Sequence, residues 1–518
     1  MSRFAIDRND REDHVSMRLS GARIRMFRNI ADSTQIIFEP DVTCLVGKNE
    51  SGKTAILQAL CRQNPAVTTS AFDELEDYPR WRYVDDRRGG RIGQTRPIEC
   101  TFHLEDEDVA AVVEELGPRV LRSRTLTRSV NYSGEAFIAF DVDEAAALIN
   151  YLDHAQISDE LRRLIKTGAG PEDLTDGRAF ADGVDRKKRA ELDALANQVA
   201  LRFQDGSAWD IAKRILKPRI PKFFYFSHYQ IMPGRVDLDE LYSTTQQPGQ
   251  SGLQTARALL RLAGAEQDVL TAEEFEQRKA ELEAISSKLT REVFSYWTQN
   301  ADLLVEIDAD NAAVQSDSDR TAILRYLDIR VRDTRRGYTS NFSQRSSGFQ
   351  WFFSFLAAFS EFEDRGHGVI VLLDEPALNL HGRAQADFLR FINERLAPNF
   401  QVVYATHSPF LVEPSHLERV RVVQDKGDEA GSVVSQDISA ADSDSLLPLK
   451  AALGHDVAQN LTLGPDDQLV EGTSDFAHLQ TMREHVLAAA ANGHNGSRSS
   501  HEHGAKRRFW RFWDHERL

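Results

Sequence analysis

The phosphate-loop pattern at residues 41–60 constrains the fold more than any other stretch of the chain. The segment reads DVTCLVGKNESGKTAILQAL: an apolar run that predicts a buried strand is followed by a polar turn and the start of a helix. The spacing of Gly47, Gly52, Lys53 and Thr54 is G-x-x-x-x-G-K-[ST], whose backbone N–H groups surround phosphate oxygens. An ordinary glycine turn is the alternative, but such a turn requires neither the strand nor the helix. The predicted nucleotide-binding residues of the loop are Gly47, Lys48, Asn49, Glu50, Ser51, Gly52, Lys53 and Thr54.

Length and composition set the outer bounds. A chain of 518 residues is long enough for about three domains. The net charge of −17 argues against a uniformly basic nucleic-acid coat, but it permits a local basic groove, because screening confines each charge to about 10 Å. The cysteines (Cys44, Cys61 and Cys100) have neither metal-ligand spacing nor a disulfide framework. Together with the absence of any apolar run of spanning length, this predicts a cytoplasmic protein with no membrane partner.

The distribution of predicted elements suggests four parts. They are an N-terminal half of an ATPase head (15–143), a mainly helical insertion for dimerisation or an arm (144–300), a C-terminal half of the head (301–440) and a C-terminal fragment with a tail (466–518). Alternation over 15–30 predicts an edge strand, and 78–96 reads as a turn-rich, arginine-rich section. Helices are predicted over 144–152, 158–166, 187–203, 252–263, 271–300 and 383–396, and strands over 98–104, 136–142, 223–226, 303–307 and 326–331.

An acidic pair ends the most apolar strand in the second half of the chain. The run GVIVLL (368–373) is followed by Asp374 and Glu375, where a phosphate-binding fold places a metal-holding aspartate and a water-activating carboxylate. A second strand, 401–404, leads to His407, which is then placed to sense the γ-phosphate. A lone histidine is more often an ordinary turn residue, and only the strand–helix–strand register favours the functional interpretation.

A small-residue turn provides a second anion-binding platform. Ser346-Ser347-Gly348-Phe349-Gln350 opens an apolar helix, and a helix N-terminus of this kind favours bound anions. We therefore predict that Ser347, Gly348 and Gln350 also contact the nucleotide.

The order of these motifs resembles that of ABC-type ATPases. VLLDEPALNLH and YATHSPFLVEP, with QRSSGFQWFFSFLAAF and Asp77-Tyr78-Pro79-Arg80, resemble the OLD (overcoming lysogenization defect) family within the RecF/SMC-like branch. The resemblance implies an α/β fold: an ABC-type P-loop ATPase head with a mainly helical insertion and a partial C-terminal Toprim-like fragment. Transporter heads fit poorly, since 346 − 54 − 1 = 291 residues separate Thr54 from Ser346.

The resemblance also implies roles for single residues, with ATP and Mg²⁺ as cofactors. Lys53 would hold the phosphates, Thr54 and Asp374 would hold Mg²⁺, Glu375 would polarise the attacking water, and His407 would contact the γ-phosphate. Ser347 and Gly348 would serve the nucleotide of a second protomer, so a homodimer through the heads is expected. Phe349 and His381 depart from the transporter pattern, and the glutamine of the usual Q-loop has no match.

The C-terminal fragment resembles the start of a Toprim nuclease. DQLVEGTSD (467–475) reads as a strand, 468–470, ending in Glu471, which the resemblance implies to hold a divalent metal. Only 518 − 471 = 47 residues follow, and none forms the D-x-D pair that two-metal cleavage needs. The nuclease site is therefore predicted to be incomplete. Residues 492–504 are compositionally disordered, and the basic, aromatic end reads as an unstructured terminus or a single-strand-binding segment.

The expected function is thus an OLD-like ATP-binding and ATP-hydrolysing protein that acts on DNA, in DNA processing or anti-phage defence. Two alternatives stay open. One is a RecF-like repair ATPase without a nuclease, and the other is a nucleotide-gated scaffold for a separate effector protein.

Overall fold

The computed structural model describes most of the chain between residues 17 and 437 and short pieces beyond it. The described residues are 17–67, 69–181, 184–203, 207–227, 231–242, 251–262, 275–296, 302–315, 321–363, 368–378, 380, 382–427, 430–437, 468–470, 482 and 509–511. The predictions for His381, Glu471 and residues 492–504 lie outside them. Within the described residues, no helix combines the length and the apolar character needed to cross a membrane.

A six-stranded sheet with the order β16-β15-β4-β14-β13-β8 forms the core. Its strands are β4 (Val42–Val46), β8 (Lys222–Ser227), β13 (Val369–Asp374), β14 (Gln401–Thr406), β15 (Val420–Asp425) and β16 (Ser432–Ser435). All neighbours are parallel except β15 and β16. Because parallel strands end at one edge of the sheet, the segments that follow β4, β13 and β14 meet there.

The edge strand β8 belongs to this sheet although it lies within the range predicted for the helical insertion. It is the aromatic strand expected at 223–226, and it pairs with β13 in parallel register. The boundaries of the insertion stay a prediction, but its range contains one strand of the core.

The central sheet separates two hydrophobic clusters. α1 (Lys53–Gln63) covers one face, and α13 (Ser347–Glu363) and α14 (Gly382–Phe391) cover the other. Neighbouring residues of β13 alternate between them: Leu372 packs with the α1 cluster and Leu373 with the α13 cluster. The predicted helix 383–396 is α14 followed by a π-helical turn, η4 (Ile392–Leu396).

A second, antiparallel sheet lies over α1, with the order β2-β1-β5-β6-β7 and with β3 also pairing with β1. Its strands are β1 (Arg18–Phe27), β2 (Ile30–Asp32), β3 (Ile36–Ile37), β5 (Ile98–His103), β6 (Thr125–Val130) and β7 (Ala136–Ala139). The prediction of an edge strand was wrong, since β1 pairs with β5 on one side and with β2 and β3 on the other. Alternation of apolar and polar residues indicates a strand with one buried face. Interior antiparallel strands show this pattern as edge strands do, so it does not distinguish them.

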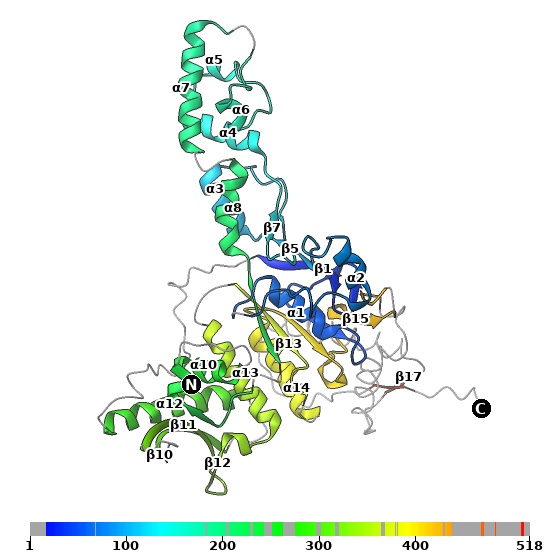
Figure 1. The fold of residues 1–518 in the computed structure, drawn as a ribbon, viewed down its shortest axis with the longest axis vertical. Coiled ribbons are helices and arrows are strands. Elements are labelled where there is room, and N and C mark those ends of the chain that lie inside the picture. Colours follow the sequence, from blue (N-terminus) through cyan, green and yellow to red (C-terminus); the bar gives the residue numbers. More distant parts are fainter. Residues whose placement is uncertain are drawn as a thin grey trace, which may run out of the picture.

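Figure 1 shows helices rising from this second sheet as an arm along the long axis of the molecule. They are α3 (Asp106–Leu116), α4 (Glu144–His154), α5 (Asp159–Arg162), α6 (Pro171–Thr175), α7 (Arg186–Arg202) and α8 (Ala208–Leu216), followed by η1 (Lys217–Arg219). α5 is shorter than the predicted helix 158–166. The backbone after it pairs across the chain instead: Lys166 N donates to Ala179 O at 2.7 Å, and Ala181 N donates to Leu164 O at 2.8 Å.

A third sheet and the helices packed with it form the opposite end of the molecule (Figure 1). The elements are β9 (Arg235–Asp237), α9 (Leu238–Tyr242), α10 (Ser251–Leu262), α12 (Phe275–Tyr296), β10 (Leu303–Gln315), β11 (Thr321–Asp333), β12 (Tyr338–Asn341) and η3 (Phe342–Gln344). The predicted strand 303–307 is the first part of β10, and the predicted strand 326–331 lies within β11; β10 and β11 form a long hairpin. It leads into α13.

Three smaller segments complete the description. α2 (Arg80–Arg88) is a helix in the section predicted to be turn-rich. The prediction holds for the turns at 89–90 and 92–94 but missed α2, because the inward positions of α2 hold a tyrosine and an aspartate and the helix lacks an apolar period. η5 (Pro409–Leu411) and η6 (Leu417–Arg419) precede β15. The predicted strand β17 (Gln468–Val470) pairs with β18 (Phe509–Arg511), so the unstructured interpretation fails for residues 509–511.

Candidate nucleotide site

The phosphate loop connects β4 to α1 at the edge where the parallel strands end. Steric constraints explain why glycine occupies two of its positions. A Cβ at Gly47 would lie 2.3 Å from the Val423 carbonyl oxygen of β15, which is too close for any side chain. Gly52 has φ +103°, a left-handed conformation that L-residues rarely adopt. Glu50 also has a positive φ, of 65°. The loop is therefore tightly wound, with Lys48, Asn49 and Glu50 exposed.

A side chain from the β1–β2 turn braces the loop from outside. Asn29 Nδ2 donates to Glu50 O at 3.2 Å and to Ser432 Oγ at 2.9 Å. No sequence pattern indicates this brace, because Asn29 and Ser432 are 403 positions apart and belong to no motif.

Lys53 is held inside the loop. Its side chain is 5% exposed, and Nζ donates to Gly47 O at 3.0 Å and to Lys48 O at 2.8 Å. Glu375 Oε1 lies 3.6 Å from the same nitrogen. Burial lowers the pKa of Lys53, while the Glu375 carboxylate acts in the opposite direction. The amine therefore lies between the loop carbonyls and the acidic end of β13. In this position its positive charge can balance the charge of an anion bound in the loop.

Asp374 ends β13 directly opposite the start of α1. Its Oδ1 accepts a hydrogen bond from Thr54 Oγ1 at 3.0 Å, and its Oδ2 accepts one from Tyr225 OH at 2.8 Å. Burial raises the pKa of Asp374, and these two hydrogen bonds oppose the shift. Thr54 and Asp374, which are 320 positions apart, thus come together as predicted.

Tyr225 was not among the predicted site residues. It projects from β8, next to β13, and burial raises the pKa of its phenol. Gln58, one turn beyond Thr54 on α1, directs Nε2 toward the Tyr225 oxygen at 3.5 Å. The sequence predicted the aromatic strand but not its neighbour, and only the sheet order places this tyrosine beside Asp374.

Glu375 and His407 form the remaining part of the site. His407 Nδ1 lies 2.9 Å from Glu375 Oε2, and the His407 backbone N–H donates to the same oxygen at 3.2 Å. Glu375 has φ 46°, and its N–H donates to Ala405 O at 3.0 Å. A non-glycine residue in this conformation is strained, and such strain clusters at functional sites. The turn aims the carboxylate at Lys53 on one side and at His407 on the other.

The donor set fits a magnesium-bound triphosphate. Mg²⁺ prefers oxygen ligands and usually takes one or two from protein and the rest from phosphates and water. Thr54 Oγ1 and Asp374 Oδ1 provide such a pair. In the described part of the chain, no group of three or more His, Cys, Asp or Glu residues could hold a metal without further ligands. The Ser51 hydroxyl is buried in the loop and has no hydrogen-bond partner there, which leaves a donor for a phosphate oxygen.

The signature residues lie elsewhere in the fold. Ser347 is exposed in the first turn of α13, and Gly348 beside it is buried. Gln350 Nε2 donates to Ser343 O at 2.9 Å and to Arg345 O at 2.7 Å, so its amide stabilises the turn before the helix. Across the described residues, no hydrogen bond or ion pair joins these three side chains to Lys53, Thr54 or the two carboxylates.

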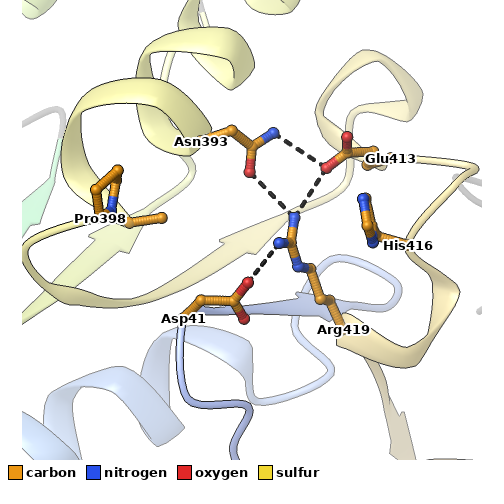
Figure 2. Close-up of a pocket in the computed structure, with 7 residues that line it drawn as sticks. Asp41, Asn393, Pro398, Glu413, His416 and Arg419 are labelled. Carbon is orange, nitrogen blue, oxygen red and sulfur yellow. Dashed lines mark hydrogen bonds and ion pairs between the residues drawn. The ribbon is translucent and has the colours of Figure 1, made fainter. Parts of the chain in front are cut away.

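A hollow of about 360 Å³ lies at the opposite edge of the central sheet, where β4, β14 and β15 begin (Figure 2). Figure 2 shows that Arg419 occupies its centre, bonded to Asp41, Glu413 and Asn393. Since these partners occupy both Nη atoms of Arg419, this guanidinium group is not available to an anionic ligand. The contacts of Arg419 connect the segments that precede β4, β14 and β15, and the hollow is separate from the nucleotide site.

Two family models match parts of the chain. Residues 261–413 match a model described as "AAA domain, putative AbiEii toxin, Type IV TA system", and residues 17–72 match one described as "AAA ATPase domain". An uncharacterized protein of Methanocaldococcus jannaschii is 32% identical over 117 residues, 22% of this chain and 30% of that protein. The chain therefore spans under a third of the curated relative that it matches.

Solved structures with a similar arrangement are heads of SMC proteins. An SMC head bound to the C-terminal winged-helix domain of ScpA has a TM-score of 0.36 and 12% identity, covering 81% of this chain and 97% of that one. The SMC head of Thermotoga maritima has a TM-score of 0.33 and 14% identity, covering 81% and 98%. From its own sheet and loop, the fold is that of a P-loop ATPase head, and two segments of the chain match models of AAA ATPase domains.

Proposed function

We propose that this chain binds ATP with Mg²⁺ and hydrolyses it to ADP and phosphate. The observation that carries the proposal is the meeting of Lys53, Thr54, Asp374 and Glu375 from two halves of the chain. In this proposal Lys53 and the loop N–H groups hold the phosphates. Bound Mg²⁺, held by Thr54 and Asp374, would offset phosphate charge.

Glu375 is the proposed general base. It would accept a proton from the water that attacks the γ-phosphorus as the bond to the leaving ADP oxygen breaks. The contact with His407 supports this role, because the His407 backbone N–H donates to Glu375 Oε2 and holds the carboxylate facing the loop. His407 would then be positioned to hydrogen-bond a γ-phosphate oxygen.

The proposed assembly is a homodimer of heads. In the described part of the chain, no hydrogen bond joins Ser347 or Gly348 to the phosphate loop, and we propose that these residues complete the site of a second copy. We further propose DNA as the partner, in an OLD-like role with Glu471 as the remnant of a nuclease site. A RecF-like repair ATPase without a nuclease shares the same head chemistry.

A nucleotide-gated scaffold for a separate effector protein is the second candidate. The description of the model matching residues 261–413 names a toxin of a toxin–antitoxin system, and this favours a partner or effector role over repair. Phosphate release that stays undetectable with and without DNA, together with a co-purifying effector, would favour the scaffold.

ATP hydrolysis by the purified protein, alone and with linear, supercoiled or single-stranded DNA, tests the main proposal. Lys53→Ala is expected to lower the rate by roughly 10²–10³-fold, because an electrostatic contact to the reacting phosphates is lost. Lys222→Ala, an exposed lysine at the start of β8, is the matched control and should keep the wild-type rate. A wild-type rate in Lys53→Ala would refute the proposal. On the same samples we expect little or no DNA cleavage, and Mg²⁺-dependent nicking that Glu471→Ala removes would contradict the incomplete nuclease site.

A further inference from the structure

The outward side of α2 carries an unusual set of exposed side chains, which we call the arginine face: Arg80, Trp81, Val84, Arg87 and Arg88. Arg80, Val84 and Arg88 follow one another at four-residue spacing, and Trp81 is a neighbour of Val84 at three-residue spacing. Trp81 is 44% exposed and Val84 is 55% exposed. Figure 1 shows α2 at the rim of the core, beside β1.

The arginine face is a local reversal of the charge of the chain. Residues 80–91 contain five arginines and two aspartates, so the local charge is 5 − 2 = +3 in a chain of −17. Within the described residues, no carboxylate forms an ion pair with Arg80, Arg87 or Arg88. Asp85 is exposed on the helix, and Glu74 and Glu76 border the face in the preceding turn. With these exposed carboxylates nearby, the excess of positive charge belongs to residues 80–91 alone, and salt screens it beyond about 10 Å.

The inward side of α2 fixes these residues on a rigid support. Asp86 is 3% exposed and accepts hydrogen bonds from Tyr78 OH at 2.7 Å and from Arg91 Nη2 at 2.6 Å. Arg82 Nε lies 3.6 Å from the same carboxylate. A single buried aspartate thus anchors the helix and holds two further arginines, each more than half exposed, beside the face. Such pre-organisation lowers the entropy cost of binding a ligand.

The Arg87 guanidinium rests 5.6 Å from the centre of the Tyr83 ring, while Trp81 has an open indole. Arginines beside an exposed aromatic ring are the combination that binds single-stranded nucleic acid, with the charges on the phosphates and the ring stacked on a base. A duplex offers the phosphates but keeps its bases stacked on one another. A phospholipid surface also offers phosphates, and its headgroup region accepts indole side chains, so phospholipid vesicles are included in the test below.

We propose that the arginine face of α2 binds single-stranded DNA, with Arg80 and Arg88 contacting phosphates and Trp81 stacking on an unpaired base. The choice of DNA rests on the proposed function, while the location and the single-stranded form rest on the side chains of α2. The face lies outside the nucleotide site, so the two proposals can fail separately.

Fluorescence anisotropy with a fluorescein-labelled oligothymidylate tests this proposal. We expect the double variant Arg80→Glu/Arg88→Glu to bind at least about 10-fold more weakly and to reduce the salt slope of log K by about 1.4, because each phosphate contact contributes about 0.7. Trp81→Ala should lose roughly 5- to 100-fold in affinity without changing the slope, because stacking involves no counterion release. Arg335→Glu/Arg336→Glu, in the exposed β11–β12 turn, is the control with the same charge change and should bind as the wild type does.

Four results would overturn the proposal. They are wild-type affinity in the double variant, equal weakening in the control variant, tighter binding of duplex DNA that Trp81→Ala leaves unchanged, and sedimentation with phosphatidylserine vesicles without binding of the oligonucleotide. Thermal unfolding of each variant checks that it is folded, since exposed substitutions should change stability by less than about 0.5 kcal/mol. Lys53-dependent ATP hydrolysis without oligonucleotide binding would refute the arginine face alone.

Discussion

At the scale of single residues, Asp374 combines a structural cost with a proposed function. Burial raises its pKa, so the fold disfavours the ionised carboxylate that Mg²⁺ would require. An asparagine could still accept from Thr54 and donate to the Tyr225 oxygen. We therefore expect Asp374→Asn to stabilise the nucleotide-free protein by roughly 0.5–2 kcal/mol, as is common when an active-site group is replaced. Thermal unfolding should also show that ATP with Mg²⁺ no longer stabilises the variant.

The control for this prediction is Asp141→Asn, at an exposed carboxylate after β7, which should leave the unfolding temperature and its response to ATP unchanged. Lower stability of Asp374→Asn, or an unaltered response to ATP with Mg²⁺, would contradict the assigned role.

The same residues show how much of the site can be predicted from the sequence. Lys53, Thr54, Asp374, Glu375 and His407 could be predicted because each follows an apolar strand, and the ends of parallel strands converge. Tyr225 and Asn29 could not, because their contacts depend on which strand lies beside β13 and which loop lies beside the β1–β2 turn. No local sequence pattern predicts which strand or loop lies beside these elements.

At the scale of elements, one buried carboxylate connects α1 to the segment before α2. Asp77 is fully buried and pairs with Arg28, whose Nε lies 3.1 Å from Oδ1, and with Arg62 of α1. Removing it leaves two cations without a partner, and breaking a buried ion pair costs about 3–5 kcal/mol. Arg28 is about one-third exposed, so water can solvate its unpaired charge and reduce the free-energy cost of losing this ion pair. We expect Asp77→Ala to destabilise the protein by about 3 kcal/mol in urea-induced unfolding.

The exposed neighbour Asp85 provides the matched control for Asp77, and Asp85→Ala should change stability by less than about 0.5 kcal/mol. Equal, small effects in the two variants would show that the ion-pair cluster does not hold these elements together.

The elements themselves were predictable where packing follows an apolar period. β4, β13 and β14 are buried on both faces and read as continuous apolar runs, so their positions followed directly from the sequence. α2 was missed because its inner side is held by the polar contacts of Asp86 and by the edge-to-face contact of Tyr78 with Tyr83. A helix anchored by hydrogen bonds and ion pairs leaves no hydrophobic period to detect.

At the scale of the whole molecule, the position of α13 argues for a second copy. Ser347 is exposed at the start of α13 and, in the described residues, forms no hydrogen bond with the nucleotide-site side chains of its own chain. Glu375→Gln would retain the loop and the metal pair but remove the proposed base. With ATP and Mg²⁺ we therefore expect this variant to accumulate as a dimer in size-exclusion chromatography with light scattering, while Glu375→Gln/Lys53→Ala stays monomeric.

The net charge predicts how salt affects the proposed dimer. Two chains that each carry a net charge of −17 repel each other, and salt screens this repulsion. The ATP-dependent dimer of Glu375→Gln should thus become more stable between low and moderate ionic strength, the opposite of the trend expected for DNA on the arginine face of α2. A variant that binds ATP but stays monomeric at every concentration would contradict the shared site. So would a dimer that forms equally well in the Lys53→Ala background, because its interface would not depend on the nucleotide.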